Sequence, residues 1–383
     1  PGSAQLAALY TAPGFAYVGV NMRGTGCSGG SFRFFETVQS LDGYDVVEAV
    51  AAQSWVMDNE VGMVGISYPG ISQLFVAATQ PPSLNSITPL SVLDDSFRST
   101  LYPGGILNTG FAVDWTQQRV DNGKPYGQEW TRVRADNQLL RLQNPDLVAE
   151  IDENPYYANP LGDSLAPITF VDRIEVPIFI AGAWQDEQTG GHFANMLASF
   201  TSSPHVFATL TNGLHTESLS PPVAGRYMEF LQLYVGKKVP DLSAGAALAS
   251  ALGGALWGVS TFAPLESRFT GMTYANALAA FEAEPPVRVH FEQGGNSAFS
   301  PGTPEPNFVV EFDAWPIPEA QATSWVLAGG GQLLAQGEAG AATDVDTSSY
   351  TADPAALPAT FYDGTDQGGG NGVWRADVQY DWR

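Results

Sequence analysis

The sequence predicts an α/β fold, a doubly wound parallel sheet followed by a β-rich carboxyl-terminal region. Three observations lead to this prediction. Residues 61–66 form a short apolar run that passes through a tight turn into helical spacing over residues 71–78. Residues 177–182 and 206–210 are again short apolar runs, each followed by a polar loop. From residue 287 onward, alternating apolar and polar residues are separated by Gly and Pro turns, which is typical of antiparallel sheets.

The turn after residues 61–66 places Ser67 between a strand and a helix. Pro69 fits the first turn of that helix, where a missing N–H needs no partner. A serine at such an elbow projects its hydroxyl into a cleft, and the first amides of the helix point to the same space. Ser67 is therefore a candidate nucleophile. The common motif is G-x-S-x-G, whereas here the second glycine, Gly70, comes one residue later, so an ordinary buried serine remains an alternative.

Two other glycine motifs lie in residues 23–30. Residues 26–30 match G-x-S-x-G, and residues 24–29 match the dinucleotide-binding pattern G-x-G-x-x-G, with Glu48 about 20 residues further on. Both follow a predicted strand over residues 16–22. A dinucleotide loop must open directly into a helix, but helical spacing begins only near Leu41. We therefore interpret residues 23–30 as a glycine-shaped loop and predict no cofactor, with a dinucleotide-binding oxidoreductase as the least favoured alternative.

A nucleophilic serine needs a base and a group that orients the base. Of the four histidines, His215 follows the predicted strand 206–210 and a short loop, so it lies beyond the carboxyl end of a strand. Ligands and catalytic groups gather at this edge of open α/β sheets. Asp186 follows the strand 177–182 in the same way, and Glu187 is the alternative acid. The chain order Ser67, Asp186, His215 is the order found in α/β-hydrolases.

The chain resembles a family of serine hydrolases that includes cocaine esterase, X-prolyl dipeptidyl-peptidases and α-amino-acid ester hydrolases. Residues 23–30 (RGTGCSGG), 42–55, 61–70 (VGMVGISYPG) and 182–186 (GAWQD) carry the resemblance. Family elbows read Gly-x-Ser-Tyr-x-Gly, so the later glycine is a family feature. The resemblance implies that Ser67, Asp186 and His215 form a catalytic triad. It also implies that the backbone N–H of Tyr68 belongs to the oxyanion hole.

Two features depart from this family. Asn21 stands where many relatives have an aspartate. The family also takes a second oxyanion donor, a tyrosine, from a loop upstream of the strand that begins here near residue 16. Tyr10 lies too close to that strand to be assigned to this role. We therefore expect that the chain lacks the family's amino-terminal strands and stops inside its last domain.

Four regions are predicted along the chain. Residues 1–100 and 166–240 would form the two parts of the α/β-hydrolase core. Residues 101–165 break the α/β pattern and include an amphipathic stretch at 130–142, so they are predicted to be a helical cap over the site. Most cap aromatics are expected in the cap's own core, and Trp184 is predicted as a wall of the substrate pocket. Residues 241–383 would contain a helical connector and an incomplete β-sandwich, which the resemblance implies is a jelly roll.

The charge balance limits the possible partners. There are 40 acidic and 16 basic residues, which give a net charge of −24. Such a surface repels nucleic acids and anionic membranes and argues against both as partners. No apolar run is long enough to span a bilayer. The single cysteine and the scattered histidines predict no metal site.

The predicted function is acyl transfer to water. The enzyme would be a serine hydrolase that cleaves ester or amide bonds of small substrates through an acyl-enzyme. One alternative is a dipeptidyl-peptidase that releases X-Pro, which would need an acidic pocket for the substrate's amino group. A second alternative, of another class, is a non-catalytic scaffold whose β-sandwich binds a partner.

Overall fold

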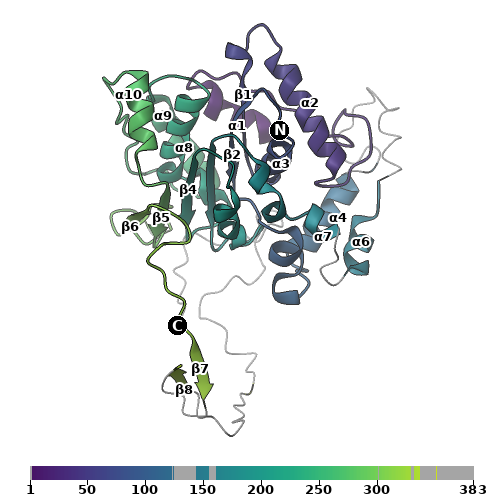
Figure 1. Cartoon of the computed structure of the whole chain (residues 1–383). Helices are drawn as coiled ribbons and strands as arrows, with labels where there is room; N and C mark the ends of the chain where they lie inside the picture. Colours follow the sequence, from purple (N-terminus) through teal and green to yellow (C-terminus); the bar gives the residue numbers. More distant parts are fainter. Residues whose placement is uncertain are drawn as a thin grey trace.

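The computed structural model describes residues 2–122, 124, 144–154, 161–300, 302–328, 332–336 and 351 (Figure 1). Its centre is a six-stranded sheet in the order β1-β2-β3-β4-β5-β6. The first five strands are parallel, and β6 is antiparallel to β5. The strands are β1 (Val61–Ile66), β2 (Leu84–Leu90), β3 (Ile178–Ala183), β4 (Val206–Thr211), β5 (Val287–Phe291) and β6 (Phe308–Phe312).

Helices cover both faces of this sheet (Figure 1). Strand β3 shows why, since all six of its residues are buried. Ile178 and Ile180 pack into the apolar layer on one face, whereas Phe179 and Ala181 pack into the layer on the other. Because successive side chains of a strand point to opposite faces, a fully apolar strand requires cover on both. One layer contains α2 (Thr37–Ala51) and α3 (Tyr68–Ala77); the other contains α1 (Gly2–Thr11), α8 (Pro221–Tyr234), α9 (Ser243–Leu256) and α10 (Tyr274–Glu282).

Strands β5 and β6 correct the predicted organisation after residue 240. The sequence places residues 287–292 and 308–312 in a β-sandwich, but β5 pairs with β4 and β6 pairs with β5. The central sheet therefore continues to Phe312, beyond the predicted end of the core. The alternation in β5, where Val287 and Val289 are buried and Arg288 is not, arises in any strand near a sheet edge. Alternation alone cannot distinguish such a strand from a sandwich strand.

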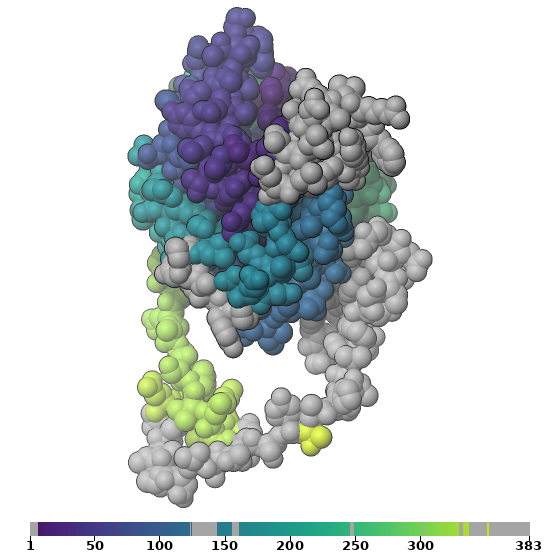
Figure 2. All heavy atoms as spheres, turned by 90° about the vertical axis from the view of Figure 1, so that its right-hand side faces the viewer, coloured from purple at the N-terminus to yellow at the C-terminus, as the bar shows by residue number. Residues whose placement is uncertain are grey.

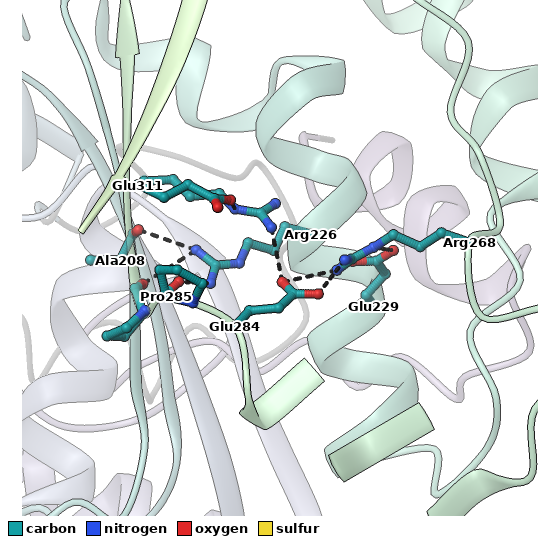
Figure 3. A network of polar contacts seen from close by, with 9 residues as sticks. Ala208, Arg226, Glu229, Arg268, Glu284, Pro285 and Glu311 are labelled. Carbon is teal, nitrogen blue, oxygen red and sulfur yellow. Dashed lines mark hydrogen bonds and ion pairs between the residues drawn. The ribbon is translucent and has the colours of Figure 1, made fainter. Parts of the chain in front are cut away.

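A network of ion pairs joins β5 and β6 to α8 (Figure 3). The guanidinium of the buried Arg226 donates to the backbone carbonyls of Pro285 (2.8 Å) and Pro286 (3.2 Å), just before β5. Burial lowers the pKa of Arg226 to about 9, and the positive charge of Arg288 adds to this effect. Arg288 of β5 pairs with Glu311 of β6 at 2.7 Å. These contacts fix the last two strands to the core.

The segment between β2 and β3 is irregular and mostly helical. It contains the π-helix η2 (Ser96–Leu101), the helices α4 (Ala112–Asn122), α6 (Leu147–Glu153) and α7 (Leu161–Ser164), and the 3₁₀ turns η3 (Pro103–Gly105), η5 (Pro167–Thr169) and η6 (Val171–Arg173). In Figure 2 its blue and teal residues lie beside the indigo residues around α2. The Phe32 N–H donates to Oδ1 of Asn144 at 2.7 Å across this contact, and Arg33 pairs with Glu150. The predicted amphipathic stretch, residues 130–142, lies outside the described residues.

The remaining elements are short. They comprise η1 (Met57–Asn59), η7 (His192–Ser199), η8 (His215–Leu219) and an antiparallel pair, β7 (Trp325–Ala328) and β8 (Gln332–Ala335), which stands apart from the sheet in Figure 1. The rest of the predicted jelly roll lies outside the described residues. The strand predicted at residues 16–22 does not form. Among the described strands β1 pairs with β2 alone, and Val18 and Val20 are about half exposed. Within the ranges described, no helix has the length and hydrophobicity needed to cross a membrane.

Candidate active site

Ser67 lies at the turn between β1 and α3, as the sequence predicts. Its backbone has φ 63° and ψ −132°, a conformation that is costly for a residue with a side chain. The turn is held from both sides. The Ser67 N–H donates to the Leu90 carbonyl at the end of β2 (2.9 Å), and the Ser67 carbonyl accepts from the N–H of Ile71 (2.7 Å). Such strain persists only where the surroundings enforce it, and it is concentrated at functional sites.

Two close approaches explain the glycine spacing of the elbow. A Cβ atom on Gly65 would lie 2.6 Å from Cβ of Pro69, and one on Gly70 would lie 2.6 Å from the Leu90 carbonyl oxygen. Both separations are shorter than real Cβ contacts, so neither position has room for a side chain. Gly70 is thus the point where α3 packs directly on the end of β2. This packing is the physical reason for the later second glycine.

Asp186 and His215 form a buried pair. Nδ1 of His215 lies 2.9 Å from Oδ1 and 2.8 Å from Oδ2 of Asp186. The carboxylate also accepts from the backbone N–H groups of Gln188 and Thr189 (2.8 Å each) and from the Thr189 hydroxyl (2.7 Å). Burial alone would raise the pKa of Asp186, but His215 and the Thr189 hydrogen bonds outweigh it and hold the pKa below its usual value. The acid is therefore ionised beside the imidazole at neutral pH.

The backbone of His215 is anchored by Glu187 and Ser91, a role that the sequence does not predict for either residue. Oε2 of Glu187 accepts from the His215 N–H at 3.0 Å. The Ser91 hydroxyl donates to the His215 carbonyl at 2.5 Å and lies 2.7 Å from the hydroxyl of Ser218. Of the two acids considered from the sequence, Asp186 thus contacts the ring and Glu187 contacts the backbone. The only sequence signal for Ser91 is its position as a polar residue directly after a strand.

The end of β2 links the elbow to the histidine loop. Leu90 accepts from the Ser67 N–H, and the next residue, Ser91, donates to the His215 carbonyl. Among the described residues, neither the Ser67 hydroxyl nor Nε2 of His215 has a hydrogen-bond partner. Catalytic hydrogen bonds of unliganded sites are often long and shorten when substrate binds.

A pocket opens beside Ser67. Its described wall is aromatic and aliphatic, with a few hydroxyl and amide groups and no charged side chain. The Thr100 and Thr116 hydroxyls in this wall donate to backbone carbonyls. The lining residues are Phe34, Phe35, Ser67, Tyr68, Ile71, Leu93, Ser96, Thr100, Leu101, Phe111, Ala112, Trp115, Thr116, Gln188 and Thr189.

Tyr68 occupies the first position of α3, where a backbone N–H has no partner inside the helix. Its ring stacks between Phe35 (centroids 4.5 Å apart) and Trp115 (5.9 Å), and its hydroxyl donates to Oε1 of Gln39 at 2.9 Å. Burial raises the pKa of the Tyr68 phenol well above its usual value. The side chain is therefore a neutral part of the wall, and only the backbone N–H suits the predicted oxyanion role.

Two aromatic assignments change. Trp184 is absent from the described pocket wall: it is 40% exposed and its ring faces Trp315 at 6.2 Å. Its backbone N–H donates to the Thr211 carbonyl at 2.9 Å and prolongs the pairing of β3 with β4. Phe111 and Trp115, expected mainly in the cap's own core, line the pocket instead. Tyr10 is remote from the site, because its hydroxyl lies 2.8 Å from that of Tyr227 in the opposite layer.

The glycine-rich loop over residues 23–30 has a structural role. Arg23 makes a two-pronged ion pair with Asp42 of α2 (2.5 and 2.6 Å). The loop does not open into a helix, since α2 begins only at Thr37. It therefore lacks the geometry that a dinucleotide pyrophosphate requires. In the part of the chain that the structure describes, no group of three or more His, Cys, Asp or Glu side chains could hold a metal ion.

Comparison with known proteins agrees with this architecture. Residues 3–217 match the model of the X-Pro dipeptidyl-peptidase (S15) family. Cocaine esterase from Rhodococcus sp. (strain MB1 Bresler) is 32% identical over 104 residues, which are 27% of this chain and 18% of the esterase. A CocE/NonD family hydrolase from Staphylococcus aureus has a TM-score of 0.56 at 19% identity, over 86% of this chain and 51% of that chain. The chain thus spans about half the length of this solved structure and shares its α/β-hydrolase fold.

Proposed function

The chain belongs to the X-Pro dipeptidyl-peptidase (S15) family of hydrolases, and we propose that it is a serine esterase acting on small neutral esters. The observation that carries this proposal is the buried Asp186–His215 pair at 2.8 Å, at the same sheet edge as the strained elbow of Ser67. An acid, an imidazole and an activated serine are the three groups that acyl transfer through a covalent intermediate needs.

In the proposed mechanism, His215 takes the proton of Ser67 as the hydroxyl attacks the ester carbonyl. Asp186 keeps the proton of His215 on Nδ1 and stabilises the imidazolium that forms. The backbone N–H of Tyr68 stabilises the oxyanion of the tetrahedral intermediate. His215 then protonates the departing alcohol, and water, activated by the same imidazole, hydrolyses the acyl-enzyme.

The pocket supports an ester substrate over an X-Pro peptide. A free amino group would need a carboxylate to replace its hydration, and the described wall contains none. Asp186 and Glu187, which precede the lining residue Gln188, are engaged by His215. Aromatic side chains such as Phe111 and Trp115 instead favour an apolar, aryl-containing acyl group.

The test combines a covalent probe with a substrate panel. We expect a fluorophosphonate to label the wild type and Ser72→Ala, a control on the same helix that is outside the described pocket wall, but not Ser67→Ala. Among p-nitrophenyl benzoate, p-nitrophenyl acetate and Ala-Pro-p-nitroanilide, the benzoate, whose acyl group is aromatic, should give the highest kcat/KM. Undiminished labelling of Ser67→Ala would contradict the catalytic assignment. Faster cleavage of the Ala-Pro amide would instead identify a dipeptidyl-peptidase.

A further inference from the structure

We propose that Glu187 and Glu217 are positioning residues that hold the His215 loop from two sides. The inference rests on the proposed function, because it concerns the residue assigned there as the base. Neither acid belongs to the triad, and neither lines the described pocket. Their contacts are with the backbone on which the imidazole is mounted.

Glu187 holds the loop through a backbone hydrogen bond. Its Oε2 accepts the His215 N–H at 3.0 Å, and its Oε1 accepts from the Gln188 side chain at 3.2 Å. Asp186 binds the imidazole of the same histidine. Two consecutive acids therefore fix His215, one through its ring and one through its backbone. A backbone N–H requires only an acceptor, so glutamine can replace Glu187 in this role and alanine cannot.

Glu217 supports the loop from inside. It lies two residues after His215, it is 8% exposed, and its N–H donates to the Leu214 carbonyl at 3.0 Å. Its carboxyl packs so closely on Gly213 that a Cβ atom there would overlap it. Among the described residues its Oε2 has no hydrogen-bond partner. A buried carboxyl in this position is more easily kept neutral than ionised.

The surroundings of Glu217 support a neutral state below pH 7. Burial raises the pKa of Glu217 to about 7; the Leu214 backbone and the Gln293 amide act against this rise, and the nearby Glu187 adds to it. Gln293 also contacts His290 of β5, whose pKa is lowered to about 4, by burial first and then by Arg288 and Arg226. The groups that act on Glu217 are thus the Leu214 backbone, the Gln293 amide and the acid Glu187.

A kinetic consequence follows from this arrangement. Because Glu217 is neutral below pH 7, an isosteric amide at this position keeps the packing against Gly213, whereas alanine removes it. Glu217→Ala should therefore loosen the histidine loop and lower kcat, and Glu217→Gln should restore most of that loss. Removing the Glu187 acceptor should leave substrate binding intact but misplace the imidazole, so kcat should fall while KM stays nearly constant.

The test uses the full chain, p-nitrophenyl benzoate from pH 5 to 9, and Glu266→Gln, an exposed acid, as the control. Glu187→Ala should lower kcat about ten- to a hundredfold with KM within about twofold, and Glu187→Gln should restore most of the loss. Glu217→Ala should lower kcat in the same direction at pH 6, and Glu217→Gln should restore most of the loss. The paired Ala and Gln variants at the two positions keep the proposal testable should one alanine variant not fold.

Several outcomes would overturn the proposal. These are an unchanged kcat in Glu187→Ala or Glu217→Ala, or equal losses in the Ala and Gln variants of either residue. If the wild type shows Ser67-dependent turnover and the variants behave like Glu266→Gln, only the positioning roles fail. If the wild type shows no Ser67-dependent turnover, the proposed function fails and this inference fails with it.

Discussion

A Cβ atom on Gly70 would lie 2.6 Å from the carbonyl oxygen of Leu90, the same oxygen that accepts the Ser67 N–H. The obstacle is backbone, which cannot rotate aside as a side chain can. Gly70→Ala must therefore push α3 away from β2 and weaken the hydrogen bond that holds the elbow. We expect the free energy of unfolding to fall by about 1–3 kcal/mol. Fluorophosphonate labelling of Ser67 should slow as well. Urea unfolding measures the change in stability, and labelling reactions quenched at a series of times measure the labelling rate.

Gly254→Ala is the matched control for this change. Gly254 lies in α9, and a Cβ atom there would meet nothing within 4 Å. Alanine should therefore raise the stability by up to about 1 kcal/mol, since it is the better helix former, and leave labelling unchanged. Equal behaviour of the two alanine variants would show that the elbow tolerates a side chain at Gly70.

Asp186→Asn tests the orientation of the imidazole. An amide in place of the carboxylate can stabilise the wrong tautomer of His215, so kcat should fall by about four orders of magnitude. KM should change little, because Asp186 is not part of the described pocket wall. Steady-state kinetics with an aryl ester measures both values. A loss confined to KM would contradict the assignment of Asp186 as the orienting acid.

The same substitution gives a stability prediction whose sign follows from the lowered pKa. Burial opposes ionisation of Asp186, but His215 and Thr189 lower its folded-state pKa below the unfolded value of 3.8. The ionised carboxylate therefore contributes stability above about pH 4, and this contribution is lost as the pH falls through the folded-state pKa. The stability difference between wild type and Asp186→Asn should shrink from pH 7 to pH 3 in urea unfolding. A constant difference would show that the carboxylate is not stabilised by its partners.

Trp115→Ala tests which aromatic side chain recognises the acyl group. Trp115 lines the pocket beside Ser67 and stacks on Tyr68, whereas Trp184 faces Trp315. Removing the Trp115 ring should lower kcat/KM for p-nitrophenyl benzoate about ten- to a hundredfold relative to the acetate. Trp184→Ala, the matched control, should keep the benzoate-to-acetate ratio within about twofold. The reverse result would restore the original prediction for Trp184.

The elbow and the acid–histidine pair could be predicted because each has a local signal. Ser67 lies between an apolar strand and helical spacing, and Asp186 and His215 each follow a strand end. Parallel strands bring their carboxyl ends to one sheet edge, so the position of each residue just after a strand is enough to place all three at the same edge. The fold class follows from the same strands.

The remaining features depend on contacts between distant segments. Nothing local in the sequence distinguishes β5 from a sandwich strand, because its neighbour β4 lies far upstream. Only the pairing of the two strands, from Ala208↔Val287 to Thr211↔His290, reveals the common sheet. Ser91 carries no motif, although it holds the His215 carbonyl 124 residues away. Nothing local in the sequence shows that Trp184 lies against Trp315 and outside the described pocket wall.

Glu217→Gln gives the last prediction, on stability and pH. Burial, reinforced by the charge of Glu187, raises the pKa of Glu217 from 4.5 to about 7. Between these values the folded protein retains a proton that the unfolded chain has lost, so this residue lowers the stability as the pH rises. The glutamine variant cannot ionise, and its stability relative to the wild type should increase from pH 4 to pH 8 by on the order of 3 kcal/mol, at about 1.4 kcal/mol per pKa unit. Urea unfolding across this range measures the difference in stability from the wild type, and for the control Glu266→Gln this difference should not change with pH. A difference that is also independent of pH for Glu217→Gln would mean that its carboxyl ionises freely, and that the histidine loop is not built around a neutral acid.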